Sequence, residues 1–176
     1  MSIFGFIVIV LIILFGATFI YITSKTNSLE IASRDRGAEI DSSIWDRTFR
    51  LSKMIEILRE KGIENDIEVP DTNAFGLGTS AFIQSARAEQ LDTADRKLRQ
   101  IIKAHPELIK DEAFSINFDK FNTARQDLFA YSLAYNKCTS AYNSYISGFP
   151  ASALATLNKK SDRQMFSYVF AEIKED

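Results

Sequence analysis

Few side chains in this sequence are of a type that does chemistry. The only histidine, His105, precedes a proline at a break between helical segments, so we expect a capping or surface role for it. The only cysteine, Cys138, has no second cysteine for a disulfide and no nearby cluster of histidines to complete a metal site. Metal-binding helical bundles use Glu-x-x-His motifs, and none occurs. The sequence therefore predicts a protein that is not an enzyme and that carries no metal or cofactor.

Phosphate and nucleic-acid binding are not predicted either. The glycines of AFGLGTS, residues 74–80, are followed by no Lys-Ser/Thr pair and preceded by no predicted strand, so they indicate a turn. The chain has 21 basic and 23 acidic residues, and this balance gives no global field to attract a polyanion. No small-molecule substrate is evident from these patterns.

The N-terminal segment is predicted to span a membrane. Residues 3–22 form an uncharged apolar run of about 20 residues, enough for a helix to cross a hydrocarbon core of about 30 Å. A cleaved signal peptide is the alternative, but no Lys or Arg precedes Lys25 and no A-x-A pattern follows Phe19. We expect a retained single-pass anchor in the lipid bilayer. Lys25, Arg34 and Arg36 favour a cytoplasmic location for the remainder.

Alternating spacings of three and four between apolar residues predict long helices after the anchor. The first continues from the anchor to about Gly62, and residues 62–80 form a distal loop. The second runs from about Thr79 to Ala104, back toward the membrane. The expected core positions of these two helices are Ile40, Ile44, Arg47, Leu51, Met54 and Leu58, followed by Phe82, Ala86, Leu91, Ala94, Leu98 and Ile101.

The third helix has the clearest pattern. Its predicted seam consists of Phe114, Phe118, Phe121, Arg125, Leu128, Ser132, Tyr135, Thr139, Tyr142, Ile146 and Phe149. A short helix is expected over Ala151–Leu157, and an amphipathic piece around Met165–Ile173 is expected to close the bundle or lie on the membrane. The predicted fold class is all-α: an N-terminal transmembrane helix (residues 1–24), then an antiparallel bundle of three long helices with a short C-terminal helix (25–157) and an amphipathic tail (158–176).

Two Tyr-Asn pairs on the third helix, Tyr135-Asn136 and Tyr142-Asn143, are followed by Ile146 and by Phe149-Pro150. This run resembles the C-terminal signature of the LemA family of bacterial membrane proteins. Further positions that are similar to the family pattern are Asn27, Leu29, Ile40-Asp41, Arg47, Ala86-Arg87, Pro106 with its neighbours His105, Glu107 and Leu108, Phe114 and Ala155. The resemblance implies a membrane-attached bundle of long antiparallel helices in bacteria, with no established catalytic activity or cofactor.

The chain also departs from this family pattern. Trp45 does not stand where the family carries its tryptophan, and Ser52 replaces a helix-one proline. Arg125 and Ser132 occupy positions at which the family has Glu and Arg. A guanidinium on a core seam needs a carboxylate partner or a side chain that reaches solvent. Equal distances from the membrane along parallel first and third helices predict an ion pair between Asp41 and Arg125. A register shifted by one turn would pair Arg125 with Glu39 or leave it in solvent.

The Tyr-Asn positions allow two interpretations. Tyrosine and asparagine are residue types found at protein interfaces, so the pairs could bind a partner. The structural interpretation, which we prefer, buries Tyr135 and Tyr142 and lets Asn136 and Asn143 hydrogen-bond across helices. The expected function is a noncatalytic scaffold or adaptor at the bacterial inner membrane that binds another membrane or envelope protein. The alternative is a structural or regulatory protein that assembles with itself.

Overall fold

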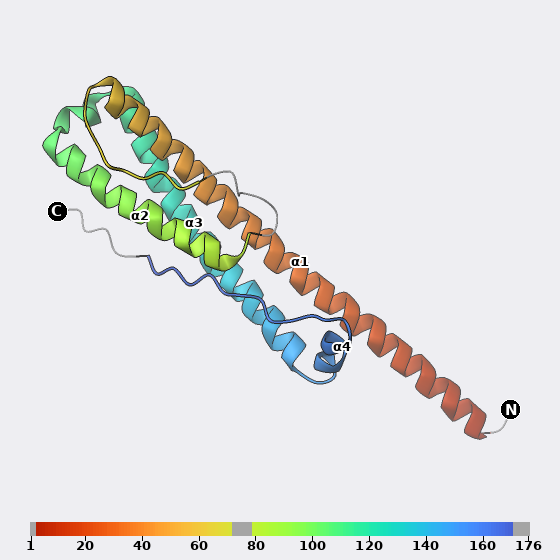
Figure 1. Ribbon diagram of the computed structural model, residues 1–176. Helices are drawn as coiled ribbons and strands as arrows, with labels where there is room; N and C mark the ends of the chain where they lie inside the picture. Colours follow the sequence, from red (N-terminus) through yellow and green to blue (C-terminus); the bar gives the residue numbers. More distant parts are fainter. Residues whose placement is uncertain (1–2, 72–78, 171–176) are drawn as a thin grey trace. The chain divides into compact units, whose positions relative to one another are not determined.

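The computed structural model describes residues 3–71 and 79–170 (Figure 1). These residues form α1 (Ile3–Glu60), α2 (Ala81–Ala104), the short 3-10 helix η1 (Pro106–Lys110), α3 (Glu112–Ser147) and α4 (Ala151–Leu157), and they include no β-strand. The predicted all-α fold class is therefore confirmed. The chain divides into two compact units: unit 1 holds residues 3–34 and 137–163, and unit 2 holds residues 35–136 and 164–170.

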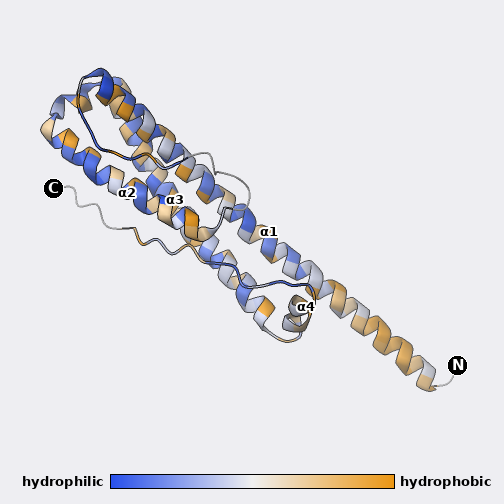
Figure 2. Ribbon diagram, viewed as in Figure 1, coloured by the Kyte–Doolittle hydropathy of each residue, from blue (hydrophilic) through white to orange (hydrophobic). Residues whose placement is uncertain are grey.

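Helix α1 is continuous over 58 residues. Its N-terminal part is apolar, as Figure 2 shows, and nearly all its large side chains up to Tyr21 are exposed. From Ile40 onward the side chains at three-four spacing are buried instead, and each is fully inaccessible: Ile40, Ile44, Arg47, Leu51, Met54 and Leu58. The predicted continuity of the apolar N-terminal segment with the first bundle helix is confirmed. Among the described residues, α1 is the one helix long and apolar enough to cross a membrane.

In unit 2, residues 35–60 of α1 pack with α2 and with the first part of α3. Ser43 donates a 2.7 Å hydrogen bond to the carbonyl of Ala124 on α3. The shared core consists mainly of aliphatic and aromatic side chains from these three helices, including Leu51, Met54, Leu91, Leu98, Phe114, Phe121 and Leu128. Burial of this apolar surface is the main favourable term that holds the unit together.

The direction predicted for the second helix is wrong. The Gln84 amide near the start of α2 donates to the Gly37 carbonyl at 2.9 Å, and Asp92, further along α2, pairs with Arg47, further along α1. Helix α2 thus runs parallel to α1, and α3 runs antiparallel to both (Figure 1).

This direction follows from the segment after α1, which returns along the bundle instead of forming a tight distal turn. Within it Ile67 and Pro70 are buried, and Asp66 pairs with Lys97 near the end of α2 at 2.7 Å. A long extended return lets the next helix start beside Gly37, where α1 enters unit 2. The remainder of the predicted loop, residues 72–78, lies outside the described residues.

The buried face of α2 differs in part from the prediction. Leu91, Ala94 and Leu98 are buried as expected, but Phe82 and Ala86 are exposed. The face that turns inward follows Ala81, Gln84, Ser85, Ala88, Leu91, Asp92, Asp95 and Leu98, which recur every three or four residues. Polar residues on that face obscured the true period in the sequence.

The seam of α3 is confirmed over most of its length. Phe114, Phe121, Leu128, Ser132, Tyr135, Thr139, Tyr142 and Ile146 are buried, whereas Phe149, beyond the helix end, is 89% exposed. In unit 1, the end of α3 and α4 form a small core of Tyr142, Ile146 and Ala155 with Leu29 beside it. The short helix predicted over Ala151–Leu157 is also confirmed.

The predicted C-terminal amphipathic piece is not a helix where the structure describes it. Residues 158–170 form neither helix nor strand, and the part from 171 to 176 lies outside the described residues. We call residues 164–170 the C-terminal strap. Its contacts, all within unit 2, are given below.

Candidate functional site: a buried charge cluster and the C-terminal strap

Three helices of unit 2 bring charged side chains together in its interior. The carboxylate of Asp92 on α2 lies 2.6 Å from Arg47 Nη1 on α1 and 3.0 Å from Arg125 Nη2 on α3. The hydroxyl of Tyr168, from the strap, donates to the same carboxylate at 2.6 Å. Arg47 is fully buried and Asp92 is 3% exposed. One carboxylate therefore joins all three helices and the strap.

The ionisation of this cluster depends on the balance between burial and pairing. Burial alone would raise the pKa of Asp92, but the hydrogen bond from Arg125 and the charge of Arg47 outweigh it and hold the pKa below its usual value. Burial lowers the pKa of Arg47, against the attraction of Asp92. Burial also raises the pKa of Asp95, which Arg99 and Arg47 offset only in part.

Arg47 is held by charge and by packing. Its contact with Asp92 is an ion pair without the alignment of a hydrogen bond, and Asp95 lies 4.0 Å from its Nη2. The guanidinium carbon lies 4.5 Å from the centroid of the Phe121 ring. A cation over an aromatic face gains electrostatic attraction without requiring a lone pair.

The strap is bound chiefly through its main chain. The Asn136 side chain donates from Nδ2 to the Phe166 carbonyl at 2.9 Å and accepts at Oδ1 from the Phe166 N–H at 2.8 Å. The Tyr135 hydroxyl donates to the Gln164 carbonyl at 2.7 Å. Ser85 Oγ on α2 accepts from the Ser167 N–H at 3.0 Å. These bonds satisfy backbone groups that a non-helical segment would otherwise leave to water.

The aromatic side chains of the strap occupy alternate positions. Phe166 is 4% exposed and belongs to the core of unit 2. Tyr168 reaches Asp92, and the Phe170 ring meets the Phe129 ring edge to face with centroids 5.3 Å apart. Between them, Met165, Ser167 and Val169 are exposed. Successive side chains of an extended chain point to opposite sides, so one side of the strap faces the bundle.

In unit 1, Asn143 makes the same double contact. It donates to the Arg163 carbonyl and accepts from the Arg163 N–H, both at 2.9 Å. Nearby, Lys160 forms an ion pair with Glu30 on α1. Asn136 and Asn143 were predicted to bond across helices. That prediction is wrong in its partner, because both amides bind the backbone of the non-helical C-terminal region. The predicted burial of Tyr135 and Tyr142 is confirmed, at 5% and 1% exposure.

The predicted ion pair between Asp41 and Arg125 is wrong. Arg125 binds Asp92 through both Nε and Nη2, at 3.0–3.3 Å. Asp41 is half-buried, and burial raises its pKa against hydrogen bonds from Gln84 and Thr79. The prediction assumed that the first and third helices are parallel, and they are antiparallel.

The remaining predicted site residues are scattered. Leu29 packs against the small core of unit 1 that holds Tyr142. Asn27 is exposed and lines a hollow of about 250 Å³ in unit 1, Pro106 begins η1, and Pro150 precedes α4. The LemA-like positions therefore do not form a single site. They divide between structural contacts in the two units.

Sequence reasoning missed three members of the charge cluster: Asp92, Asp95 and Tyr168. A usable signal existed for the two aspartates, because they share a helical face with Leu91 and Leu98, and seam arginines on the other helices require carboxylates. Tyr168 carries no comparable signal, since its segment has no helical period.

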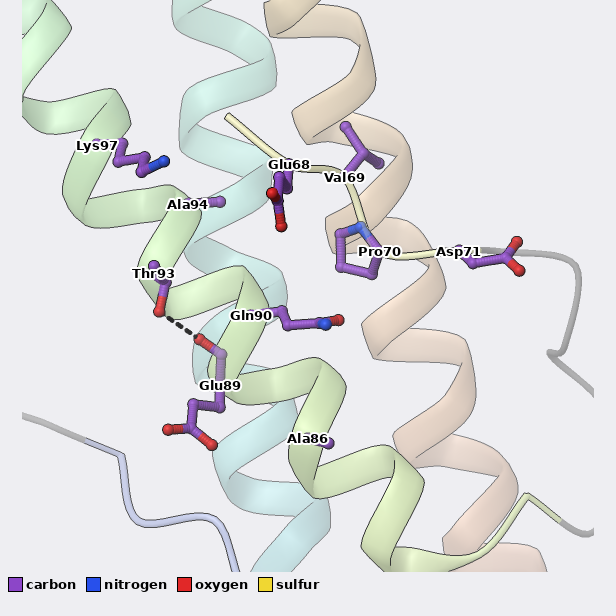
Figure 3. A pocket seen from close by; sticks show the side chains of 10 residues that line it. All are labelled: Glu68, Val69, Pro70, Asp71, Ala86, Glu89, Gln90, Thr93, Ala94 and Lys97. Atoms are coloured by element: carbon purple, nitrogen blue, oxygen red, sulfur yellow. Dashed lines mark hydrogen bonds between the residues drawn. The ribbon is translucent and has the colours of Figure 1, made fainter. Parts of the chain in front are cut away.

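A surface hollow in unit 2 lies between α2 and residues 68–71 of the return segment, the extended stretch that follows α1 (Figure 3). It has a volume of about 520 Å³, and its walls include the carboxylates of Glu68, Asp71 and Glu89. Lys97 at its edge is paired with Asp66. Over the described residues, no group of three or more His, Cys, Asp or Glu side chains is placed to hold a metal ion. The hollow carries no arrangement that defines a ligand.

Comparison with known proteins found no matching family model, no matching curated protein and no matching solved structure.

Proposed function

We propose that this chain is a noncatalytic, membrane-anchored helical adaptor of the LemA family, in the bacterial inner membrane, and that unit 2 binds another membrane or envelope protein. The observation that carries the proposal is the continuity of α1, whose exposed apolar part is followed, without a break, by residues that form the core of unit 2. Exposure of the apolar side chains from Ile3 to Tyr21 to water would be unfavourable. Insertion of this segment into lipid removes that exposure.

The Tyr-Asn pairs support membership of the LemA family. In both pairs the tyrosine is buried and the asparagine binds backbone, so each pair has a definite structural task. The basic residues Lys25, Arg34 and Arg36 that follow the apolar segment support a cytoplasmic location for the rest of the chain.

A binding role for unit 2 is supported by an exposed aromatic pair on α1. Trp45 and Phe49 are 48% and 38% exposed and stack with ring centroids 5.5 Å apart. Tryptophan and phenylalanine are enriched in the centres of protein interfaces. Paired aromatic rings on a bundle surface therefore favour a protein partner over a solvated face.

Membrane attachment is tested by alkaline carbonate extraction of cells that express the full chain. We expect the wild-type protein in the pellet at full length. Replacing Ile12 and Phe15 by lysine should move it to the supernatant, because each charge at the centre of a span costs about 2.5–3.5 kcal/mol. Wild-type protein in the supernatant would exclude the anchor.

Partner binding is tested by site-specific photocrosslinking in intact membranes, with the probe beside Trp45. We expect one crosslinked product that disappears in Trp45→Ala and persists in Phe82→Ala, a matched change of an exposed aromatic residue on α2. A product that contains only this chain would support self-assembly instead. A product equally strong in Trp45→Ala would exclude the aromatic pair as the contact.

A further inference from the structure

We propose that the surface of unit 2 beneath the C-terminal strap is a binding groove for an extended segment of a partner protein. That segment has aromatic residues at alternate positions around a central tyrosine. In the absence of the partner the strap occupies the groove as an intramolecular ligand. The inference rests on the proposed function as an adaptor, for which it names the class of partner and the means of control. The groove is formed by Ser85 and Asp92 on α2 and by Tyr135 and Asn136 on α3.

The groove recognises an extended main chain. Asn136 hydrogen-bonds both the N–H and the C=O of Phe166. Tyr135 binds the carbonyl of Gln164, and Ser85 binds the N–H of Ser167. Bonds of this kind are independent of the side chains of the bound segment, as in other modes of peptide recognition through the backbone. The helices therefore present a set of donors and acceptors that any extended segment can use.

Specificity comes from what the groove offers on its inner side. Phe166 is buried, Tyr168 donates its hydroxyl to Asp92, and Phe170 lies against Phe129. Asp92 is paired with two arginines, so it stays a charged acceptor for a hydroxyl donor. A segment that fits must therefore have a tyrosine with an aromatic residue two positions before it and another two positions after it.

The strap is suited to leave the groove without dismantling the bundle. Its residues belong to no helix or strand, and only Phe166 among them is fully buried, while Tyr168 and Phe170 are half-buried against the core of unit 2. The other buried members of that core come from the three long helices, from η1 and from the return segment. Segments with few buried apolar contacts open at lower free energy than the core elements.

Contacts just before the strap argue that the competitor is another protein and not the strap of a second copy. Arg163, the residue before the strap, is bound on both its N–H and its C=O by Asn143 of the same chain, and Lys160 is paired with Glu30. The start of the strap is thus held to its own chain. An exchange between copies would have to break these contacts as well.

A labelled peptide with the sequence of residues 164–170 is the probe, added to the full chain in detergent micelles and followed by fluorescence anisotropy. The covalently attached strap acts at a high effective concentration, so we expect weak binding to the wild-type chain. In the full chain with Phe166→Ala and Tyr168→Ala, which shortens two side chains of the strap and leaves every groove residue in place, the affinity for the peptide should rise by at least about tenfold.

Two further substitutions, each added to the chain with Phe166→Ala and Tyr168→Ala (the weakened chain), distinguish peptide binding in the groove from binding elsewhere. Asn136→Ala should abolish the gain, whereas Asn143→Ala, the same change one heptad further along α3, should leave it, because Asn143 contacts Arg163 and not the strap. A peptide with alanine at its three aromatic positions should not bind. Circular dichroism of each variant confirms that the helices remain folded.

Three results would overturn the inference. The first is a folded, weakened chain that binds the peptide no better than wild type. The second is amide hydrogen exchange at Phe166 and Ser167 as slow as that of the helical core, which would make the strap an inseparable part of the core. The third is a dimer of the weakened or wild-type chain that exchanges straps. Peptide binding is read without a membrane, so its failure is distinguishable from failure of the anchor or of the crosslinked partner.

Discussion

Replacing Asp92 by alanine should destabilise the bundle by about 3 kcal/mol. The side chain of Asp92 is 4% exposed, and it is the carboxylate nearest to Arg47, which has no solvent exposure. Removing one partner of a buried ion pair costs about 3–5 kcal/mol, because the other charge is left uncompensated. Asp95 remains 4.0 Å from Arg47, and the side chain of Arg125 is 17% exposed and can reach water, so we expect the lower end of that range.

The measurement is thermal unfolding of the full chain in detergent, followed by circular dichroism. For a protein of this size, a loss of about 3 kcal/mol lowers the melting temperature by about 10 °C. Asp66→Ala is the matched control, because Asp66 also forms an ion pair, at 2.7 Å from Lys97, but its side chain is 84% exposed. We expect that control to melt with the wild type.

A second substitution tests the cause. Adding Arg47→Met to the Asp92→Ala chain should recover much of the lost stability, because an apolar side chain of similar length removes the uncompensated charge. If Asp92→Ala melts within about 2 °C of Asp66→Ala, the charge cluster does not carry the stability assigned to it. If Arg47→Met lowers the melting temperature further, the loss arises from packing and not from an unpaired charge.

Three more outcomes are expected. Tyr135→Ala should cost about 3 kcal/mol by truncating a buried aromatic side chain, whereas Leu133→Ala, an exposed neighbour, should change the melting temperature little. A double-mutant cycle of Asp92→Ala and Arg125→Ala should give a coupling energy of about 0.5–3 kcal/mol, and a value of zero would contradict the contact. Burial and the hydrogen bond to Asp92 raise the pKa of Tyr168. Its contribution to the free energy of unfolding is therefore complete below the unfolded pKa of about 10 and is lost as the pH rises above that value. The difference in melting temperature between wild type and Tyr168→Phe should therefore shrink from about pH 9 to about pH 11, a range that brackets the pKa of tyrosine in the unfolded chain. A difference that stays constant over this range would refute the assignment.

Local patterns in the sequence were sufficient for the long helices. The apolar run and the three-four spacing that follows it predict α1 as one helix, and the seam of α3 is predicted from Phe114 to Ile146. Both signals are properties of a single helix, because a helical face repeats every 3.6 residues whatever its neighbours are. The same reasoning predicts burial of Tyr135 and Tyr142 without knowledge of their partners.

Tertiary structure decided the direction of α2 and, with it, the pairing of charges. The sequence of residues 61–80 is compatible with a tight turn or with a long return, and only packing of Ile67 and Pro70 against the bundle selects the return. This choice makes α2 parallel to α1 and brings Asp92 to Arg125 in place of Asp41. Which residues pair across two helices depends on the relative direction and register of the helices. The apolar spacing within one helix carries no information about either.

The strap is the clearest case of a structure set by its surroundings. Its residues have β-like alternation and no helical period, yet they form no strand, because their backbone groups bind side chains of α2 and α3 and not another strand. Asn136 and Tyr135 were identified from the sequence, but their acceptor and donor groups on the strap were not. An extended segment with few internal hydrogen bonds takes its conformation from the surface that binds it, so the sequence determined the helices and the tertiary structure determined what they hold.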